Sequence, residues 1–83
     1  MTRPGWTDVA VVRRDRTAPT GETTVVRLLG MLPAHWTCSP GAVGQDRVVL
    51  RVELGGGTDE TAVRLAFSRV LSDAALHGWS REA

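Results

Sequence analysis

The sequence has little of several features that mark specialised classes of protein. It contains one cysteine, Cys38, and none of its ten basic residues is a lysine. A single thiol excludes an internal disulfide and a cysteine-rich zinc site. No apolar run approaches the roughly 18 residues of a membrane span, and no apolar signal-peptide core follows Met1. With a formal net charge of +1, the chain has no overall attraction for nucleic acid or membranes, so we expect a cytoplasmic protein that binds neither.

What is present is typical of one small globular domain. The 83 residues are 42% hydrophobic and 23% charged, as in folded proteins of ordinary composition. We expect residues 1–7 to be a flexible lead-in, residues 8–80 to form the domain and residues 81–83 to be a tail. A core of this size is often helped by a partner.

The clearest periodic pattern lies in residues 46–71. From Asp46 to Leu54 every second residue is apolar, which predicts a strand with one buried face. Three glycines at 55–57 end that strand. Thr58 is expected to cap a helix. The buried face of this helix, read from helical spacing, consists of Val63, Ala66, Phe67, Val70 and Leu71.

Residues 22–36 are ambiguous between a strand and a helix. The β-branched residues 23–26 favour a strand. The apolar residues nevertheless fall at helical spacing, with Arg27 opposite them, and this favours a helix that Pro33 ends or kinks. The residues at that spacing are Val25, Leu28, Leu29, Leu32 and Trp36.

The remaining segments supply strands and their connections. Residues 9–12 form a short apolar run rich in β-branched residues, so residues 8–14 are predicted to be a strand. A second strand is predicted at residues 37–43, where Pro40 and Gly41 place it at a sheet edge or in a bulge. Residues 44–46 connect it tightly to the next strand. Residues 73–80 either continue the second helix or form a short last strand.

This order predicts an α+β, ferredoxin-like βαββα(β) sandwich, with an antiparallel sheet and two helices on one face. The other face of the sheet is then half apolar, which predicts a homodimer interface. The residues expected in this interface are Ala10, Val12, Val49 and Arg51.

With these elements in place, the chain resembles an ACT domain, and more narrowly the short form of the small regulatory subunit of acetolactate synthase (acetohydroxyacid synthase). The resemblance rests on the order and spacing of several segments, because none of them is specific alone. These segments are residues 9–12, 25–32, 35–39, 48–54 and 66–73.

The resemblance implies a non-catalytic subunit without a cofactor of its own. It would form a homodimer and bind the large catalytic subunit, a thiamine-diphosphate enzyme of branched-chain amino-acid biosynthesis. It also implies a valine, leucine or isoleucine effector. The backbone N–H groups at the start of the first helix would bind the effector carboxylate, in the loop that contains Pro19, Thr20, Gly21 and Thr23. The chain departs from the family here, because Thr20 separates the proline from the glycine and the family's asparagine is absent.

Other functions remain open from the sequence. A small DNA-binding module of three strands and one helix requires residues 22–32 to be a strand, so that Arg27, Arg47 and Arg51 share a sheet face. A ferredoxin-like interaction domain of another pathway is a further alternative. A small ferredoxin-like enzyme is disfavoured, since the sequence offers no persuasive acid–base pair.

Two local patterns qualify as candidate sites. His35 and Cys38 are three residues apart, but two ligands do not make a zinc site, so the thiol is interpreted as structural. An arginine cluster at residues 13, 14 and 16 is either solvated or binds an acidic partner surface. Leu65 and Leu76 are expected on the exposed side of the second helix.

Overall fold

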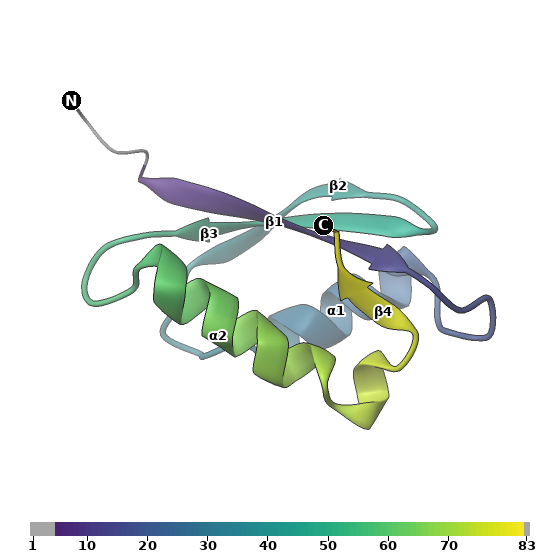
Figure 1. Ribbon diagram of the computed structural model, residues 1–83. Coiled ribbons are helices and arrows are strands. Elements are labelled where there is room, and N and C mark those ends of the chain that lie inside the picture. Colours follow the sequence, from purple (N-terminus) through teal and green to yellow (C-terminus); the bar gives the residue numbers. More distant parts are fainter. Residues whose placement is uncertain (1–4, 83) are drawn as a thin grey trace.

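The computed structural model describes residues 5–82. Four strands form one antiparallel sheet in the order β2-β3-β1-β4, and both helices lie on the same side of it (Figure 1). The protein is therefore an α+β fold with a four-stranded antiparallel sheet and two helices. Its elements are β1 (Trp6–Arg13), α1 (Gly21–Met31), β2 (Cys38–Val43), β3 (Arg47–Glu53), α2 (Glu60–Leu71), the 3₁₀ turn η1 (Ala74–Leu76) and β4 (Trp79–Arg81).

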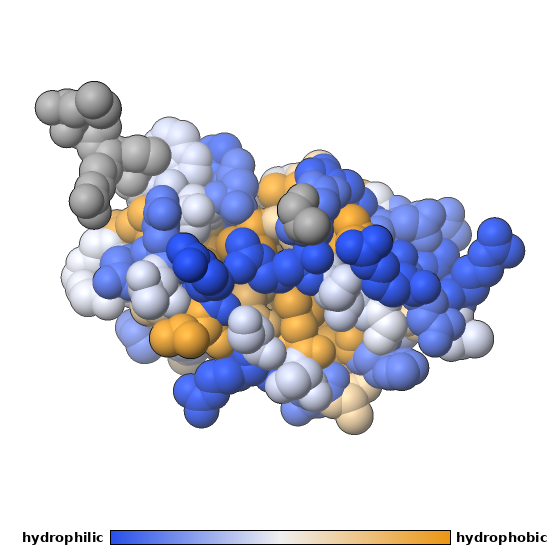
Figure 2. All heavy atoms as spheres, viewed as in Figure 1, coloured by the Kyte–Doolittle hydropathy of each residue, from blue (hydrophilic) through white to orange (hydrophobic). Residues whose placement is uncertain are grey.

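The core lies between the sheet and the helices. Alternate residues of the two central strands are buried on the helix side, among them Val9 and Val11 of β1. Leu28 of α1 and Phe67 of α2 pack into the same cluster with 0% of their surface exposed. In Figure 2, apolar residues show in the middle of the molecule, and hydrophilic residues dominate its periphery. The predicted one-sided burial of residues 46–54 is confirmed.

Residues 21–31 form a helix, as the apolar spacing predicts. Val25 and Leu28 are buried, whereas Leu29 remains 37% exposed. The helix ends at Met31, because Leu32 has the extended backbone that a following proline requires, with ψ 157°. Trp36, expected on the helix, therefore lies beyond its end and only packs against the core.

Strand β2 has the edge position and the bulge that Pro40 and Gly41 predict. It pairs only with β3, and its register shifts between Pro40 and Val43. The tight connection that follows is also confirmed. The Gly44 N–H donates to the Arg47 carbonyl at 2.8 Å, so residues 44–46 make the turn of a hairpin. We call residues 38–53 the β2–β3 hairpin.

Helix α2 begins one residue later than the sequence predicts. Asp59, not Thr58, caps it, since the Asp59 carboxylate accepts from the Ala62 N–H at 2.8 Å. Thr58 instead pairs with Gly55 across a tight turn. The three glycines at 55–57 all have positive φ, 122°, 60° and 92°, a region that residues with a side chain rarely adopt.

Residues 73–80 form a 3₁₀ turn and then a strand. Gly78, with φ +87°, turns the chain into β4, which pairs with β1 so that Trp79 lies opposite Arg13. The strands reach beyond the expected domain limits, because β1 begins at Trp6 and β4 includes Arg81. Residues 1–4 of the lead-in expected at 1–7, and residue 83 of the tail expected at 81–83, lie outside the described residues.

The two leucines expected on the exposed side of α2 have opposite environments. Leu65 is 62% exposed, as expected. Leu76 is only 1% exposed, because it belongs to η1, which folds back beside both helices. The prediction for Leu76 is wrong, since it extends the helical spacing past the end of α2.

We expect Leu76→Ala to lower the free energy of unfolding by about 2–5 kcal/mol, because it leaves a cavity in the core. Leu65→Ala is the matched control and should change it by less than about 0.5 kcal/mol. Urea unfolding followed by circular dichroism measures both values. Equal losses in the two variants would contradict this placement of Leu76.

Candidate functional site

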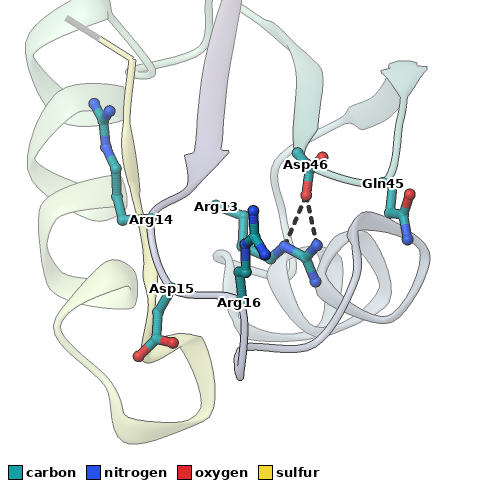
Figure 3. A pocket seen from close by; sticks show the side chains of 6 residues that line it. All are labelled: Arg13, Arg14, Asp15, Arg16, Gln45 and Asp46. Carbon is teal, nitrogen blue, oxygen red and sulfur yellow. Dashed lines mark hydrogen bonds and ion pairs between the residues drawn. The ribbon is translucent and has the colours of Figure 1, made fainter.

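An open hollow lies where β1 ends, beside the turn of the β2–β3 hairpin. We call it the arginine hollow (Figure 3). It contains the arginine cluster that the sequence indicates, together with two hairpin residues that no sequence pattern connects to it. The residues that line it are Arg13, Arg14, Asp15, Arg16, Gln45 and Asp46.

The guanidinium group of Arg13 is fully engaged in contacts within the protein. Its Nε donates to Asp46 Oδ1 at 2.8 Å, and its Nη2 lies 2.6 Å from the same oxygen. Its Nη1 donates to the Ala18 carbonyl at 3.2 Å. The Arg13 side chain is 14% exposed and that of Asp46 is 66% exposed. Arg13 therefore fastens the loop after β1 to the hairpin, and its positive charge is largely covered.

The other two arginines face solvent in different directions. Arg14 turns away toward β4, where its Nε donates to Ser80 Oγ at 3.0 Å (Figure 3). Arg16 is exposed, and its guanidinium forms no hydrogen bond or ion pair with any residue between 5 and 82. Arg16 is thus the arginine of the hollow that is most available to a partner.

Asp15 orders the loop that follows β1. Its Oδ1 accepts from the Thr17 N–H at 2.9 Å and from the Thr17 hydroxyl at 2.8 Å. These hydrogen bonds favour the ionised carboxylate and hold the pKa of Asp15 below its ordinary value, with a smaller contribution from His77. The His77 Nε2 lies 3.6 Å from Asp15 Oδ2, so the loop also meets the turn before β4.

The loop predicted to hold an effector is partly occupied by the protein itself. The Pro19 carbonyl accepts from the Trp79 indole N–H at 2.8 Å. The Gly21 N–H, at the start of α1, donates to the Gln45 carbonyl at 3.0 Å. Thr20 is the N-cap residue but forms no side-chain capping bond, and Thr23 is exposed on the first turn. The four residues lie close together in the chain. However, the Gly21 N–H, one of the backbone donors expected to bind an effector carboxylate, already donates to the Gln45 carbonyl.

Because Gly21 has no side chain, the start of α1 can lie directly against the turn of the β2–β3 hairpin. It is buried, and a Cβ at this position would collide with the Gly44 carbonyl oxygen. A side chain would push the hairpin away from α1. The start of α1 and the turn of the β2–β3 hairpin are therefore one packed unit.

The predicted interface residues all lie on the sheet face opposite the helices, which we call the outer face. Ala10 and Val49 are direct partners across β1 and β3, and like Val12 they are half-buried. Arg51 is exposed and forms a 3.1 Å ion pair with Asp8. Asp8 lies on the same face, because its alternation with Ala10 along β1 places both residues there, but it was not among the predicted interface residues.

Cys38 does not have the surroundings of a reactive thiol. Burial raises the pKa of the Cys38 thiol, which lowers the fraction of nucleophilic thiolate. Between residues 5 and 82, no three side chains of the metal-binding types come together as a metal site.

In comparisons with protein-family models, curated proteins and solved structures, the chain matches none of them. Neither helix in the described part of the chain has the length and apolarity needed to cross a membrane.

We expect Trp79→Phe to lower the free energy of unfolding by about 1–3 kcal/mol, because it removes both the hydrogen bond to Pro19 and part of a buried ring. Trp6→Phe is the control, since Trp6 is 45% exposed, and its effect should stay below about 0.5 kcal/mol. Chemical unfolding of the two variants gives both values. A Trp79→Phe protein as stable as the parent would show that this contact does not hold the loop.

The chemical shift of the Thr17 amide can report the ionisation of the Asp15 carboxyl group, to which that amide donates. Because hydrogen bonds lower the pKa of Asp15, the stabilisation it provides is complete above the ordinary value of 3.8 and is lost as the pH falls through the lower, folded value. The Thr17 amide chemical shift should therefore titrate with a midpoint below 3.8 in NMR spectra. Asp15→Asn should abolish that titration. A midpoint at or above 3.8 would contradict the described loop.

Proposed function

We propose that this chain is a non-catalytic, ACT-like regulatory subunit that binds the catalytic subunit of a thiamine-diphosphate-dependent acetolactate synthase. The observation that carries the proposal is the order of the elements. Two strand–helix–strand units interleave so that β1 and β3 lie together in the centre and both helices lie on one side. This arrangement supports a ferredoxin-like plan, which the ACT resemblance requires.

The arginine hollow is the proposed docking surface for the catalytic subunit. Arg13 is used internally, while Arg16 and the outer end of Arg14 face solvent. Guanidinium groups bind carboxylates through two parallel hydrogen bonds. The complementary surface on the catalytic subunit is therefore acidic.

Effector binding is proposed to involve the β2–β3 hairpin. A branched-chain amino acid whose carboxylate binds at the start of α1 has to displace the Gln45 carbonyl from the Gly21 N–H. Gln45 also lines the arginine hollow. Binding of the effector would thus change the surface that contacts the catalytic subunit, which gives regulation a physical route.

The DNA-binding alternative loses its structural premise. It requires residues 22–32 to be a strand, but most of this segment is helix α1. Arg27 donates to the Ala75 carbonyl at 3.0 Å, on the helical side of the molecule, so it does not share a sheet face with Arg47 and Arg51. In the other alternative, in which the chain is an interaction domain of another pathway, the arginine hollow is still the docking surface and only the partner protein differs.

The test is to mix the chain with the acetolactate synthase catalytic subunit of the same organism. The chain alone should form no acetolactate, whereas the mixture should show a changed rate and a changed melting temperature of the catalytic subunit. Arg16→Glu should weaken the association roughly tenfold, because it reverses one interface charge. Arg64→Glu, on the exposed side of α2, is the control and should have no effect.

Two outcomes would remove the assignment. If the rate, the melting temperature and the elution volume of the catalytic subunit are all unchanged on mixing, acetolactate synthase is not the partner. If Arg64→Glu weakens binding as much as Arg16→Glu, the arginine hollow is not the docking surface.

A further inference from the structure

Strand β2 is an exposed edge strand without a charged residue. It pairs with β3 alone, and every residue after the partly buried Cys38 is exposed. Its sequence is Cys-Ser-Pro-Gly-Ala-Val. Natural proteins usually protect such an edge with charged side chains or by covering it. Because β2 has no charges, we expect part of another protein to cover it.

Three residues of β2 point toward the helix side of the sheet. Cys38, Pro40 and Val43 pair with the three residues of β3 that are fully buried beneath the helices. Residues directly opposite each other on neighbouring strands point to the same face. Val43 is nevertheless 39% exposed, because β2 is the outermost strand.

The neighbouring side of α1 is apolar as well. Helix α1 lies over β2 and β3. Arg27 donates to the Ala75 carbonyl at 3.0 Å, so the side of α1 that carries Arg27 faces η1. Val26 and Leu29 lie about 100° and about 160° around the helix from Arg27, on the side that faces away from η1. They are 68% and 37% exposed, respectively.

Together these residues form a surface that we call the apolar flank, which consists of Val26, Leu29, Cys38, Pro40 and Val43. Contiguous exposed apolar surface of this kind marks sites of protein–protein contact. The flank continues into the arginine hollow, because residues 44–46 join β2 to β3 and two of them line the hollow. The start of α1 is packed against the same turn.

We infer that an amphipathic helix of the catalytic subunit covers the apolar flank and extends the docking surface that begins at the arginine hollow. The inference rests on the proposed function and names the element that the partner contributes. Continuity with the hollow favours this occupant. A partner that binds Arg16 has only the turn at residues 44–46 to cross before it reaches Val43.

The flank favours a helix over an added strand. Pro40 has no N–H to donate, and the register of β2 shifts between Pro40 and Val43, so the free edge opposes a regular ladder. A helix binds through side chains instead, with apolar residues at i, i+3 or i+4, and i+7. The length of β2, roughly 20 Å, corresponds to about four helical turns. The end of this helix near residues 44–46 carries the acidic residue that binds Arg16.

Cys38 is a built-in reporter of coverage, because it is the only cysteine of the chain and lies on the flank. Iodoacetamide alkylates a thiol through its thiolate, so the reaction is followed in alkaline buffer by the mass of the intact chain. Saturating catalytic subunit should slow the alkylation of Cys38 at least tenfold. An unchanged rate in a complex that has formed would overturn the inference. A rate that falls as the chain alone is concentrated would assign the flank to a second copy, and would also overturn it.

Val26→Asp and Leu65→Asp form a matched pair for the binding measurement. Both residues are exposed aliphatic side chains on helices, 68% and 62% exposed, so both variants should keep the circular dichroism spectrum of the parent. Val26→Asp should weaken binding to the catalytic subunit at least tenfold, because it places a charge inside an apolar contact. Leu65→Asp, on α2, should change binding less than twofold. Equal effects of the two substitutions would exclude the flank.

The helical form of the occupant needs a separate measurement. With p-benzoylphenylalanine in place of Val26, illumination of the complex should cross-link the chain to one segment of the catalytic subunit. A synthetic peptide of that segment should slow the alkylation of Cys38 and gain helical circular dichroism when it binds. Cross-linking only between copies of the chain, a peptide that does not bind, or a peptide that binds without gaining helix would each contradict the inference.

These outcomes separate the inference from the proposed function. If a complex forms but Cys38 stays as reactive as before and Val26→Asp binds like the parent, the catalytic subunit docks elsewhere and only the inference fails. If no complex forms at all, the acetolactate synthase assignment fails together with the inference.

Discussion

Val48, Leu50 and Val52 have 0% of their surface exposed, and all three lie on one face of β3. Because successive residues of a strand point to opposite sides, this burial also fixes what the other side presents. A slip of one residue in register would bury Arg51 and expose the core. The helices, η1 and Trp79 close over the first side, and the outer face is left with a balanced set of charges around a small apolar centre.

The sequence predicted the parts of the fold that depend on local rules. Alternation identified β3, and Pro33 marked the end of α1 to within two residues. The errors arose where two local signals competed. Thr58 and Asp59 are both good N-cap residues, and only the turn made by the glycines decides between them. Leu76 continued the helical spacing, but the chain leaves the helix before reaching it.

Only part of the candidate site could be predicted from the sequence. Its arginines are neighbours in the chain, but the residues that they contact are distant in sequence. Polar contacts that join distant segments include those of Arg13 with Asp46, Trp79 with Pro19 and Arg47 with Glu82. No periodicity or motif links such pairs, since they meet only after the sheet has set the positions of its strands. The same contacts determine which arginines are already committed within the chain and which remain at the surface.

The turn at residues 55–57 has a practical consequence. It joins β3 to α2 at the end of the sheet opposite the arginine hollow, because β1 and β3 run antiparallel. All three glycines are exposed, and a Cβ at any of them would meet no atom within 4 Å. Exposed loop tips of this kind tolerate inserted segments. An epitope or a fluorescent reporter placed there would follow the molecule in a cell without touching the arginine hollow.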